Sequence, residues 1–321
     1  MPWLILLPST TRRRAAAFDP LSLVPLLLCL AFLAVRPPCA AGGAETLFDG
    51  ERAFEHLRAQ CNFGPRPPGS TAHTRCLKWI TAMCRQCDLE TTHQSFRAYI
   101  PLMKRTVRLN NVIAVHQPDN PRKLMLSAHW DTRPVADRES DPGRRRLPIL
   151  GANDGASGVA VLLELARVFR QHPPRVGVVF VFFDGEDAGD SGSSQGFCLG
   201  SQYLAAHLQP QWQFEQGINL DMVGDRDLLI PIEGDSWAKA RALALAIWEP
   251  GARLYPQTFQ ARRGVQVFDD HVAFLDRGKP YVNVIDFDYP YWHTLEDTED
   301  KCSADSLERV GRVVARFVLS R

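Results

Sequence analysis

Val176-Gly-Val-Val-Phe-Val-Phe-Phe183, followed at once by Asp184-Gly-Glu-Asp187, is the stretch of sequence that decides the fold. The run from Val176 to Phe183 is continuously apolar, and most of its residues are β-branched or aromatic. Such a run is typical of a strand that is buried on both faces, as in a parallel sheet. We therefore predict a central strand here, with carboxylates directly after its end.

The segments on either side of this strand alternate between helical and strand-like patterns. Helices are expected within 44–89, where a loop at 63–70 interrupts the pattern, and at 159–170, 201–207, 237–248 and 304–319. Strands are expected at 123–128, 216–222 and 281–287, and 96–115 is expected to form two strands around a turn. This alternation predicts an α/β fold, a three-layer sandwich with a central, mostly parallel mixed β-sheet flanked by helices.

The overall composition is that of an ordinary globular protein, with 45% hydrophobic and 23% charged residues in a chain of 321. The formal net charge is only +1, so no basic field would gather nucleic acid, and we exclude that class of partner. No repeat or linker divides residues 42–321, which we predict to be one domain. We expect a monomer.

The first 41 residues have the order of a signal peptide. Arg12 to Arg14 form a positive region, 21–35 is a short apolar run, and small residues follow from Cys39. A membrane span needs roughly 20 apolar residues, which is more than this run provides. We predict that 1–41 is a signal peptide or an N-terminal anchor. The protein is then secreted, periplasmic or in the secretory pathway, and an uncleaved anchor would be its only contact with a membrane.

Six cysteines remain after residue 41: Cys61, Cys76, Cys84, Cys87, Cys198 and Cys302. In an oxidising compartment some of them could form disulfides, but the sequence does not give the pairing. Cys84 and Cys87 form a CxxC motif. No second Cys or His pair lies near this motif, so we do not expect a structural zinc site there.

Acidic and imidazole side chains follow the ends of several expected strands. In open α/β sheets, ligands bind outside the carboxyl ends of the strands. A single carboxylate at such a place usually caps a helix or a turn, but here five segments deliver such groups. The residues expected at this rim are His129, Asp131, Asp154, Asp184, Glu186, Asp187, Asp221 and His293.

A cluster of carboxylates repels itself unless a cation neutralises it. Carboxylate oxygens together with imidazole nitrogens suit Zn²⁺, with Mn²⁺ or Co²⁺ as alternatives. Glu186 and Asp187 are adjacent, so we expect one to bind the metal and the other to carry a proton. Cys198 is interpreted as a packed loop thiol.

The ordered motifs of this chain resemble those of the M28 superfamily of zinc peptidases. They are His129-Trp-Asp131, Gly151-Ala-Asn-Asp-Gly-Ala-Ser-Gly158, Asp184-Gly-Glu-Asp187, Asn219-Leu-Asp-Met222 and Trp292-His-Thr294. Further stretches resemble the bacterial glutaminyl-peptide cyclotransferases (glutaminyl cyclases) of that superfamily: His129-Trp-Asp-Thr-Arg-Pro134, Phe197-Cys-Leu-Gly-Ser-Gln-Tyr203 and Phe268-Asp-Asp-His271. The resemblance implies that 42–321 is a zinc catalytic domain.

The resemblance also implies roles for particular residues. Asp154, Asp187 and His293 match the ligands of a single zinc ion, and Glu186 matches the proton-transfer residue. Asp221 and Asp269 match the acidic network beside that base. Trp292 matches an aromatic wall of the substrate pocket, with Phe197 in place of a second tryptophan, and His129 is expected beside the substrate. Animal cyclases carry Glu-Glu where this chain has Glu186-Asp187, which we interpret as a difference between branches.

The implied reaction converts the N-terminal glutamine of a peptide or protein to pyroglutamate and releases ammonia. The alternative is an aminopeptidase with two zinc ions, in which Asp154 bridges the metals and His129 and Asp221 complete the second site. The sequence retains both residues and so leaves this alternative open. A third possibility, an inactive binding module, is disfavoured because Glu186 is intact.

Overall fold

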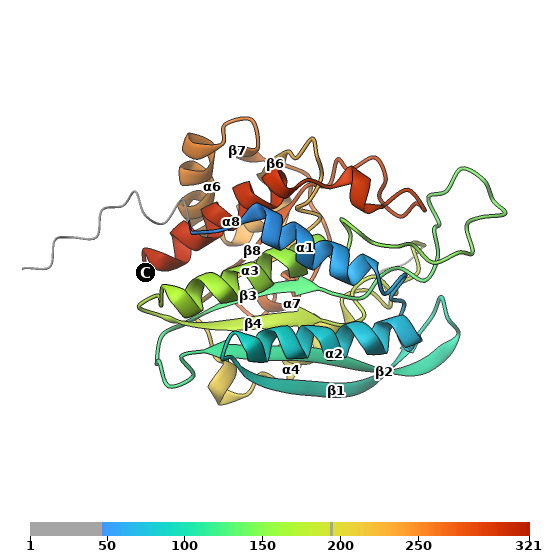
Figure 1. Ribbon diagram of the computed structural model, residues 1–321, viewed down its shortest axis with the longest axis horizontal. Helices are drawn as coiled ribbons and strands as arrows, with labels where there is room; N and C mark the ends of the chain where they lie inside the picture. Colours follow the sequence, from blue (N-terminus) through green and yellow to red (C-terminus); the bar gives the residue numbers. More distant parts are fainter. Residues whose placement is uncertain (1–46, 193–194) are drawn as a thin grey trace, which may run out of the picture. The chain divides into compact units, whose positions relative to one another are not determined.

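The computed structural model describes residues 47–192 and 195–321, and its main feature is a six-stranded sheet (Figure 1). The order is β1-β2-β4-β3-β5-β8, with β4 in its interior. β2 is antiparallel to both β1 and β4, whereas β4, β3, β5 and β8 run parallel. The strands are β1 (Glu90–Ile100), β2 (Arg105–His116), β3 (Lys123–His129), β4 (Gly177–Phe183), β5 (Gln216–Asp221) and β8 (Tyr281–Ile285). This confirms the predicted mostly parallel, mixed sheet.

The apolar run that led to this prediction forms β4, and every residue of that strand is buried. β4 can be apolar on both faces because helices cover both faces of the sheet. In Figure 1, α1, α2, α3 and α8 lie in front of the sheet, and α4 and α7 lie behind it. These helices are α1 (Gly50–Cys61), α2 (Thr71–Gln86), α3 (Ser157–Gln171), α4 (Leu199–Ala206), α7 (Val272–Leu275) and α8 (Ala304–Leu319).

The region after β5 differs from the prediction. A single helix was expected at 237–248, but two helices form, α5 (Gly234–Lys239) and α6 (Arg241–Leu254). Ala240 separates them, with a non-helical φ of −132° and ψ of 32°. The Glu233 side chain caps α5 by accepting hydrogen bonds from the Asp235 and Ser236 backbone N–H groups, which starts that helix earlier than expected.

Short elements that the sequence did not indicate complete the fold. β6 (Ile230–Ile232) and β7 (Phe259–Arg263) form a separate two-stranded parallel sheet. Two 3-10 helices, η2 (Pro210–Trp212) and η3 (Glu299–Lys301), lie in connections. Each is too short to show a period in the sequence.

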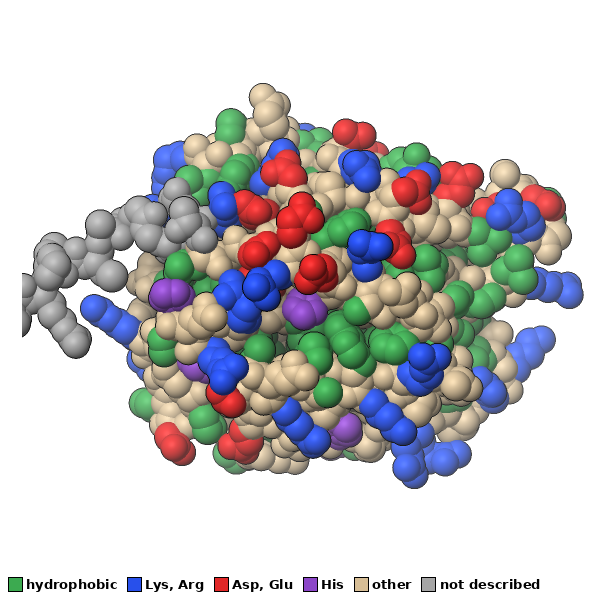
Figure 2. All heavy atoms as spheres, viewed as in Figure 1, with side chains coloured by type: hydrophobic (Ala, Val, Ile, Leu, Met, Phe, Trp, Pro, Cys, Tyr) green, Lys and Arg blue, Asp and Glu red, His purple; other side chains and the backbone are tan. Residues whose placement is uncertain are grey.

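The six cysteines of the described region are free thiols, and all but Cys87 are buried. The predicted signal peptide or anchor at 1–41, and the domain boundary after it, lie outside the described residues. Within the described part, no helix has the length and apolar character that crossing a membrane requires. Basic and acidic side chains are interspersed on the face drawn in Figure 2.

Candidate metal centre and active site

Parallel strands bring the chemistry-bearing side chains to one edge of the sheet. β3 ends at His129, β5 ends at Asp221, and β4 ends one residue before Asp184. The strand ends are aligned, because His129 pairs with Phe183 and Asp221 pairs with Ile285. The turn before α3 and the loop after β8 add further groups to this edge. The predicted rim therefore exists.

Asp154, Asp187 and His293 form the first cluster, in which one donor atom of each lies within 4.8 Å of the others. The Nε2 atom of His293 is 3.2 Å from Asp187 Oδ1 and 3.7 Å from Asp154 Oδ2. All three side chains are buried. The structure thus brings together the three residues that the sequence suggested as zinc ligands.

The donor set of this cluster fits a zinc ion. Asp154 Oδ2 and Asp187 Oδ2 are buried, and neither has a hydrogen-bond partner among the described residues. Burial and the nearby charge of Asp187 raise the pKa of Asp154 to about 6. Unpartnered buried carboxylate oxygens are costly, and a cation bound between them removes that cost. Two carboxylates and one imidazole also leave a tetrahedral ion one position for a substrate.

Arg133 and Asp137 hold two of these side chains in place. Asp137 Oδ1 lies 3.2 Å from His293 Nδ1, the ring nitrogen that faces away from the cluster. Arg133 donates hydrogen bonds to Asp137 Oδ2 at 2.7 Å and to Asp187 Oδ1 at 2.9 Å. Burial alone would raise the pKa of Asp187, but His293 and Arg133 outweigh it, so the pKa is lowered. Asp187 therefore stays ionised and able to bind a metal.

Asp131 and Asp297 shape the two loops that carry the carboxylates. Asp131 accepts hydrogen bonds from the backbone N–H groups of Glu186 and Asp187, at 3.1 and 3.4 Å. Asp297 accepts hydrogen bonds from the backbone N–H groups of Asn153 and Asp154, at 2.8 and 3.1 Å. The role of Asp297 was missed from the sequence, because it lies in an acidic segment that resembles a solvated turn.

His129, Asp154 and Asp221 form a second cluster that shares Asp154 with the first. The Nε2 atom of His129 is 3.2 Å from Asp154 Oδ1 and 3.1 Å from Asp221 Oδ1. Asp154 thus presents one oxygen to each cluster. Here the structure differs from one expectation. His129 is 1% exposed and does not line the pocket, since Asp154 and Asp221 lie against it, so it is not placed to contact a substrate.

Glu186 lies beside Asp187 of the first cluster and forms a third group with Cys198 and Asp269. Burial raises its pKa well above the usual range of a glutamate, and the charges of Asp269 and Asp187 add to that shift, against the opposing effect of His129. The Cys198 thiol donates a hydrogen bond to Glu186 Oε1 at 3.3 Å. Asp269 accepts hydrogen bonds from the side-chain amides of Asn219 and Asn283. A buried carboxyl with a raised pKa can both take and return a proton.

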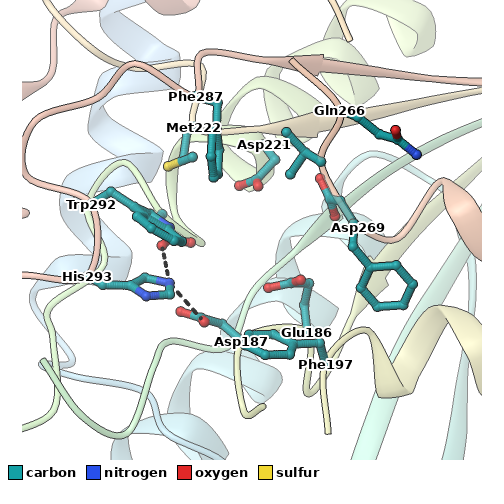
Figure 3. A pocket seen from close by; sticks show the side chains of 13 residues that line it. Glu186, Asp187, Phe197, Asp221, Met222, Gln266, Asp269, Phe287, Trp292 and His293 are labelled. Atoms are coloured by element: carbon teal, nitrogen blue, oxygen red, sulfur yellow. Dashed lines mark ion pairs between the residues drawn. The ribbon is translucent and has the colours of Figure 1, made fainter. Parts of the chain in front are cut away.

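These groups open into a cavity of about 370 Å³. Figure 3 shows Glu186, Asp187, Asp221, Asp269 and His293 arranged around this space. The cavity's aromatic walls are Phe197, Phe268, Phe287 and Trp292. Trp292 and Phe197, which the sequence suggested as substrate-binding residues, therefore line the same cavity as the candidate metal ligands.

Three non-glycine residues at this site have left-handed backbone conformations: Met222 (φ 45°), Cys198 (φ 53°) and His293 (φ 57°). Such conformations cost energy in L-residues, and they persist where surrounding contacts fix them, which is often at functional sites. Met222 follows the end of β5, Cys198 directly precedes α4, and His293 lies in the segment after β8. Their positions are thus set by the fold rather than by local preference.

The fold and the site are those of an α/β protein with a candidate metal centre of carboxylate and imidazole groups. Residues 111–318 match the model of peptidase family M28, and the chain belongs to that family. The glutaminyl-peptide cyclotransferase of Drosophila melanogaster is 28% identical over 285 residues, which cover 79% of this chain and 77% of that protein. The resemblance noted from the motifs is thereby confirmed.

Solved structures of the same fold include a bacterial glutaminyl cyclase and a bacterial exopeptidase. The glutaminyl cyclase of Porphyromonas gingivalis superimposes with a TM-score of 0.81 and 34% identity, covering 84% of this chain and 98% of its own. A Zn-dependent exopeptidase of Parabacteroides distasonis gives a TM-score of 0.82 and 30% identity, covering 85% and 99%. Proteins named for either activity therefore share this fold.

Proposed function

We propose that the protein is a zinc-dependent glutaminyl-peptide cyclotransferase, an acyltransferase that converts an N-terminal glutamine to pyroglutamate and releases ammonia. The observation that carries the proposal is the position of Glu186, a buried carboxyl with a raised pKa beside a three-ligand centre in an aromatic cavity. Cyclotransferases among its relatives support the same assignment.

In the proposed reaction the α-amine of the glutamine attacks its own side-chain carbonyl carbon. Zinc held by Asp154, Asp187 and His293 would act as a Lewis acid toward the carbonyl oxygen. Glu186 takes a proton from the attacking amine and returns it to the leaving amide nitrogen, so that the C–N bond of the side chain breaks and ammonia departs. No water is consumed, and the attacking group is already tethered to the carbonyl.

Asp269 and Asp221 assist in this scheme without forming covalent bonds to the substrate. Asp269 shares a cluster with Glu186 and Cys198, and we propose that it orients the leaving nitrogen. Asp221 lines the cavity and binds His129, which holds one oxygen of Asp154. Trp292 and Phe197 would exclude water and confine the glutamine side chain.

A two-zinc aminopeptidase is the second candidate, and the shared Asp154 favours it. His129, Asp154 and Asp221 would hold a second ion, and Glu186 would then activate a water molecule. The two functions are separated by supplying dipeptides that begin with glutamine or with leucine and by counting zinc per chain. Ammonia release at one zinc supports the cyclotransferase. Hydrolysis of the leucine peptide at two zincs overturns it, and no turnover of either peptide indicates a binding module.

We also propose that the enzyme is an exported monomer that acts on peptides or proteins with N-terminal glutamine. The proposal rests on the sequence of residues 1–41. N-terminal sequencing of the mature protein and its mass in solution test it. An intact Met1 in a soluble cytoplasmic fraction would exclude export.

A further inference from the structure

A second cavity of about 290 Å³ lies beside the catalytic one and has no part in the proposed reaction. Phe287 lines both cavities. The second cavity is formed by the short β6–β7 sheet on one side and by the end of β8 on the other. Its apolar lining includes Leu229, Pro231, Val265 and Phe287.

Two of these apolar residues are unusually exposed. Val265 is 58% and Phe287 is 38% exposed, although most of the large apolar side chains of the described chain are buried. Exposed apolar surface beside a catalytic pocket is a common mark of a ligand-binding surface. Because Phe287 lines both cavities, a substrate chain that leaves the first cavity past Phe287 would meet the second.

The spacing of an extended peptide fits this arrangement. In a strand-like chain, side chains of residues 1 and 3 point to the same side and are roughly 6.6 Å apart. If the glutamine side chain of residue 1 enters the catalytic cavity, the side chain of residue 3 points toward the same surface, about one aromatic side chain further along. Residue 2 points the other way, toward solvent.

The charges of the second cavity favour a positively charged side chain. Asp286 and Asp288 line it, and the carboxylate of Asp288 accepts no hydrogen bond from any described residue. Glu233, also in the lining, is occupied by the N–H groups that it caps. Arg262 is the basic residue of the lining, and its Nε donates to Gln260. The carboxylate of Asp286 is buried, and its two oxygens accept the backbone N–H groups of Leu229 and Asp288. Asp288 is therefore the exposed carboxylate of this lining that remains available to a cation.

We propose that this cavity is a subsite for the third residue of the peptide substrate, and that it prefers a lysine or arginine there. The aliphatic part of the side chain would pack on Phe287 and Val265, and its cationic end would reach the exposed carboxylate of Asp288. This inference rests on the proposed cyclotransferase function. It narrows the substrate class to glutamine-initiated peptides with a basic third residue.

The test compares kcat/KM for three amidated peptides, Gln-Gly-Lys-Gly, Gln-Gly-Glu-Gly and Gln-Lys-Gly-Gly. Solvent-accessible ion pairs are weak, so we expect the first peptide to be about two- to fivefold better than the other two at low salt. The advantage should shrink at high salt, because screening weakens exposed charge pairs. The third peptide carries the same net charge as the first and isolates the position of the lysine.

Two variants test whether the preference for a basic third residue arises in this cavity. Asp288→Asn should bring the Lys-to-Glu ratio close to one. Asp119→Asn removes an exposed carboxylate at the other end of the sheet, between β2 and β3, and should leave the ratio unchanged. Equal rates for all three peptides, or an unchanged ratio in Asp288→Asn, overturn the subsite. Failure to cyclise any of them instead overturns the proposed function, so the two failures are distinguishable.

Discussion

Replacing Asp137 by asparagine tests whether the residues behind the candidate ligands determine metal affinity. Asp137 contacts His293 Nδ1 at 3.2 Å and Arg133 Nη2 at 2.7 Å. It therefore favours the ring form in which Nε2 is free for the metal. It also keeps Arg133 from pairing with Asp187 alone. Asparagine keeps the size of the side chain and removes its charge.

The expected loss follows from these contacts. A hydrogen bond to a charged group contributes about 1.5–3 kcal/mol, and each 1.4 kcal/mol is a factor of ten in affinity. Because the Asp137 side chain is 27% exposed, solvent replaces part of the lost interaction. We therefore expect the lower part of that range, a zinc affinity reduced about 10- to 50-fold.

Zinc dissociation constants are measured by competition with a chromophoric chelator, with circular dichroism to verify folding. Asp141→Asn is the matched control, since Asp141 is an exposed residue of the same loop that accepts only the Gly143 N–H. A dissociation constant for Asp137→Asn within twofold of the unaltered protein would refute the reasoning. In that case His293 is either held by other contacts or does not bind the metal.

Four further predictions concern catalysis, metal binding and stability. Glu186→Gln should keep zinc and lose about 10²–10⁴-fold in kcat, which ammonia release and metal analysis measure together; normal turnover would remove Glu186 from the mechanism. His293→Ala should lose zinc, so full occupancy in that variant would exclude His293 as a ligand. Cys198→Ala should lower kcat about fivefold, since it removes the thiol that donates to Glu186, and an unchanged kcat would show that this hydrogen bond has no catalytic effect. Burial, with Arg52 and Arg167, lowers the pKa of His56 from 6.5 to about 4, so the folded state releases a proton that the unfolded state holds. The contribution of neutral His56 to the free energy of unfolding is then fully present above pH 6.5 and is lost, by at most about 3 kcal/mol, as the pH falls toward 4. Urea unfolding of His56→Gln should lack this loss. His172→Gln, at an exposed histidine, should retain it.

The sheet could be predicted because its strands are long and strongly patterned. The run that forms β4 is unambiguous, and parallel pairing then places the residues after β3, β4 and β5 at one edge. The helix at 304–319 was predicted to the residue, because its apolar positions keep a helical period. The break at Ala240 was missed because α6 restarts there without a side-chain cap, so no capping residue marks the break in the sequence.

The sequence predicted which residues form the site, but not how deep each of them lies below the cavity surface. Sequence order indicates which residues reach the rim, but not which of them face the cavity. His129 was expected beside the substrate, yet it lies under Asp154 and Asp221. Asp297 was not expected at all, because its function depends on two backbone N–H groups more than 140 residues earlier. Phe287 was expected at the end of a strand, and its place between two cavities depends on the unpredicted β6–β7 sheet.

The free cysteines provide a built-in measure of unfolding. Five of the six thiols in the described region are buried, and Cys87 alone is partly accessible. In the folded protein a thiol reagent should therefore modify one position quickly and the others only when the chain opens. Mass spectrometry of the labelled chain would report, helix by helix, when α1 (Cys61), α2 (Cys76 and Cys84) and the loop before α4 (Cys198) lose their protection. Comparing the zinc-loaded protein with protein treated with a chelator would then measure how much the ion slows the opening of each region. No probe would have to be introduced.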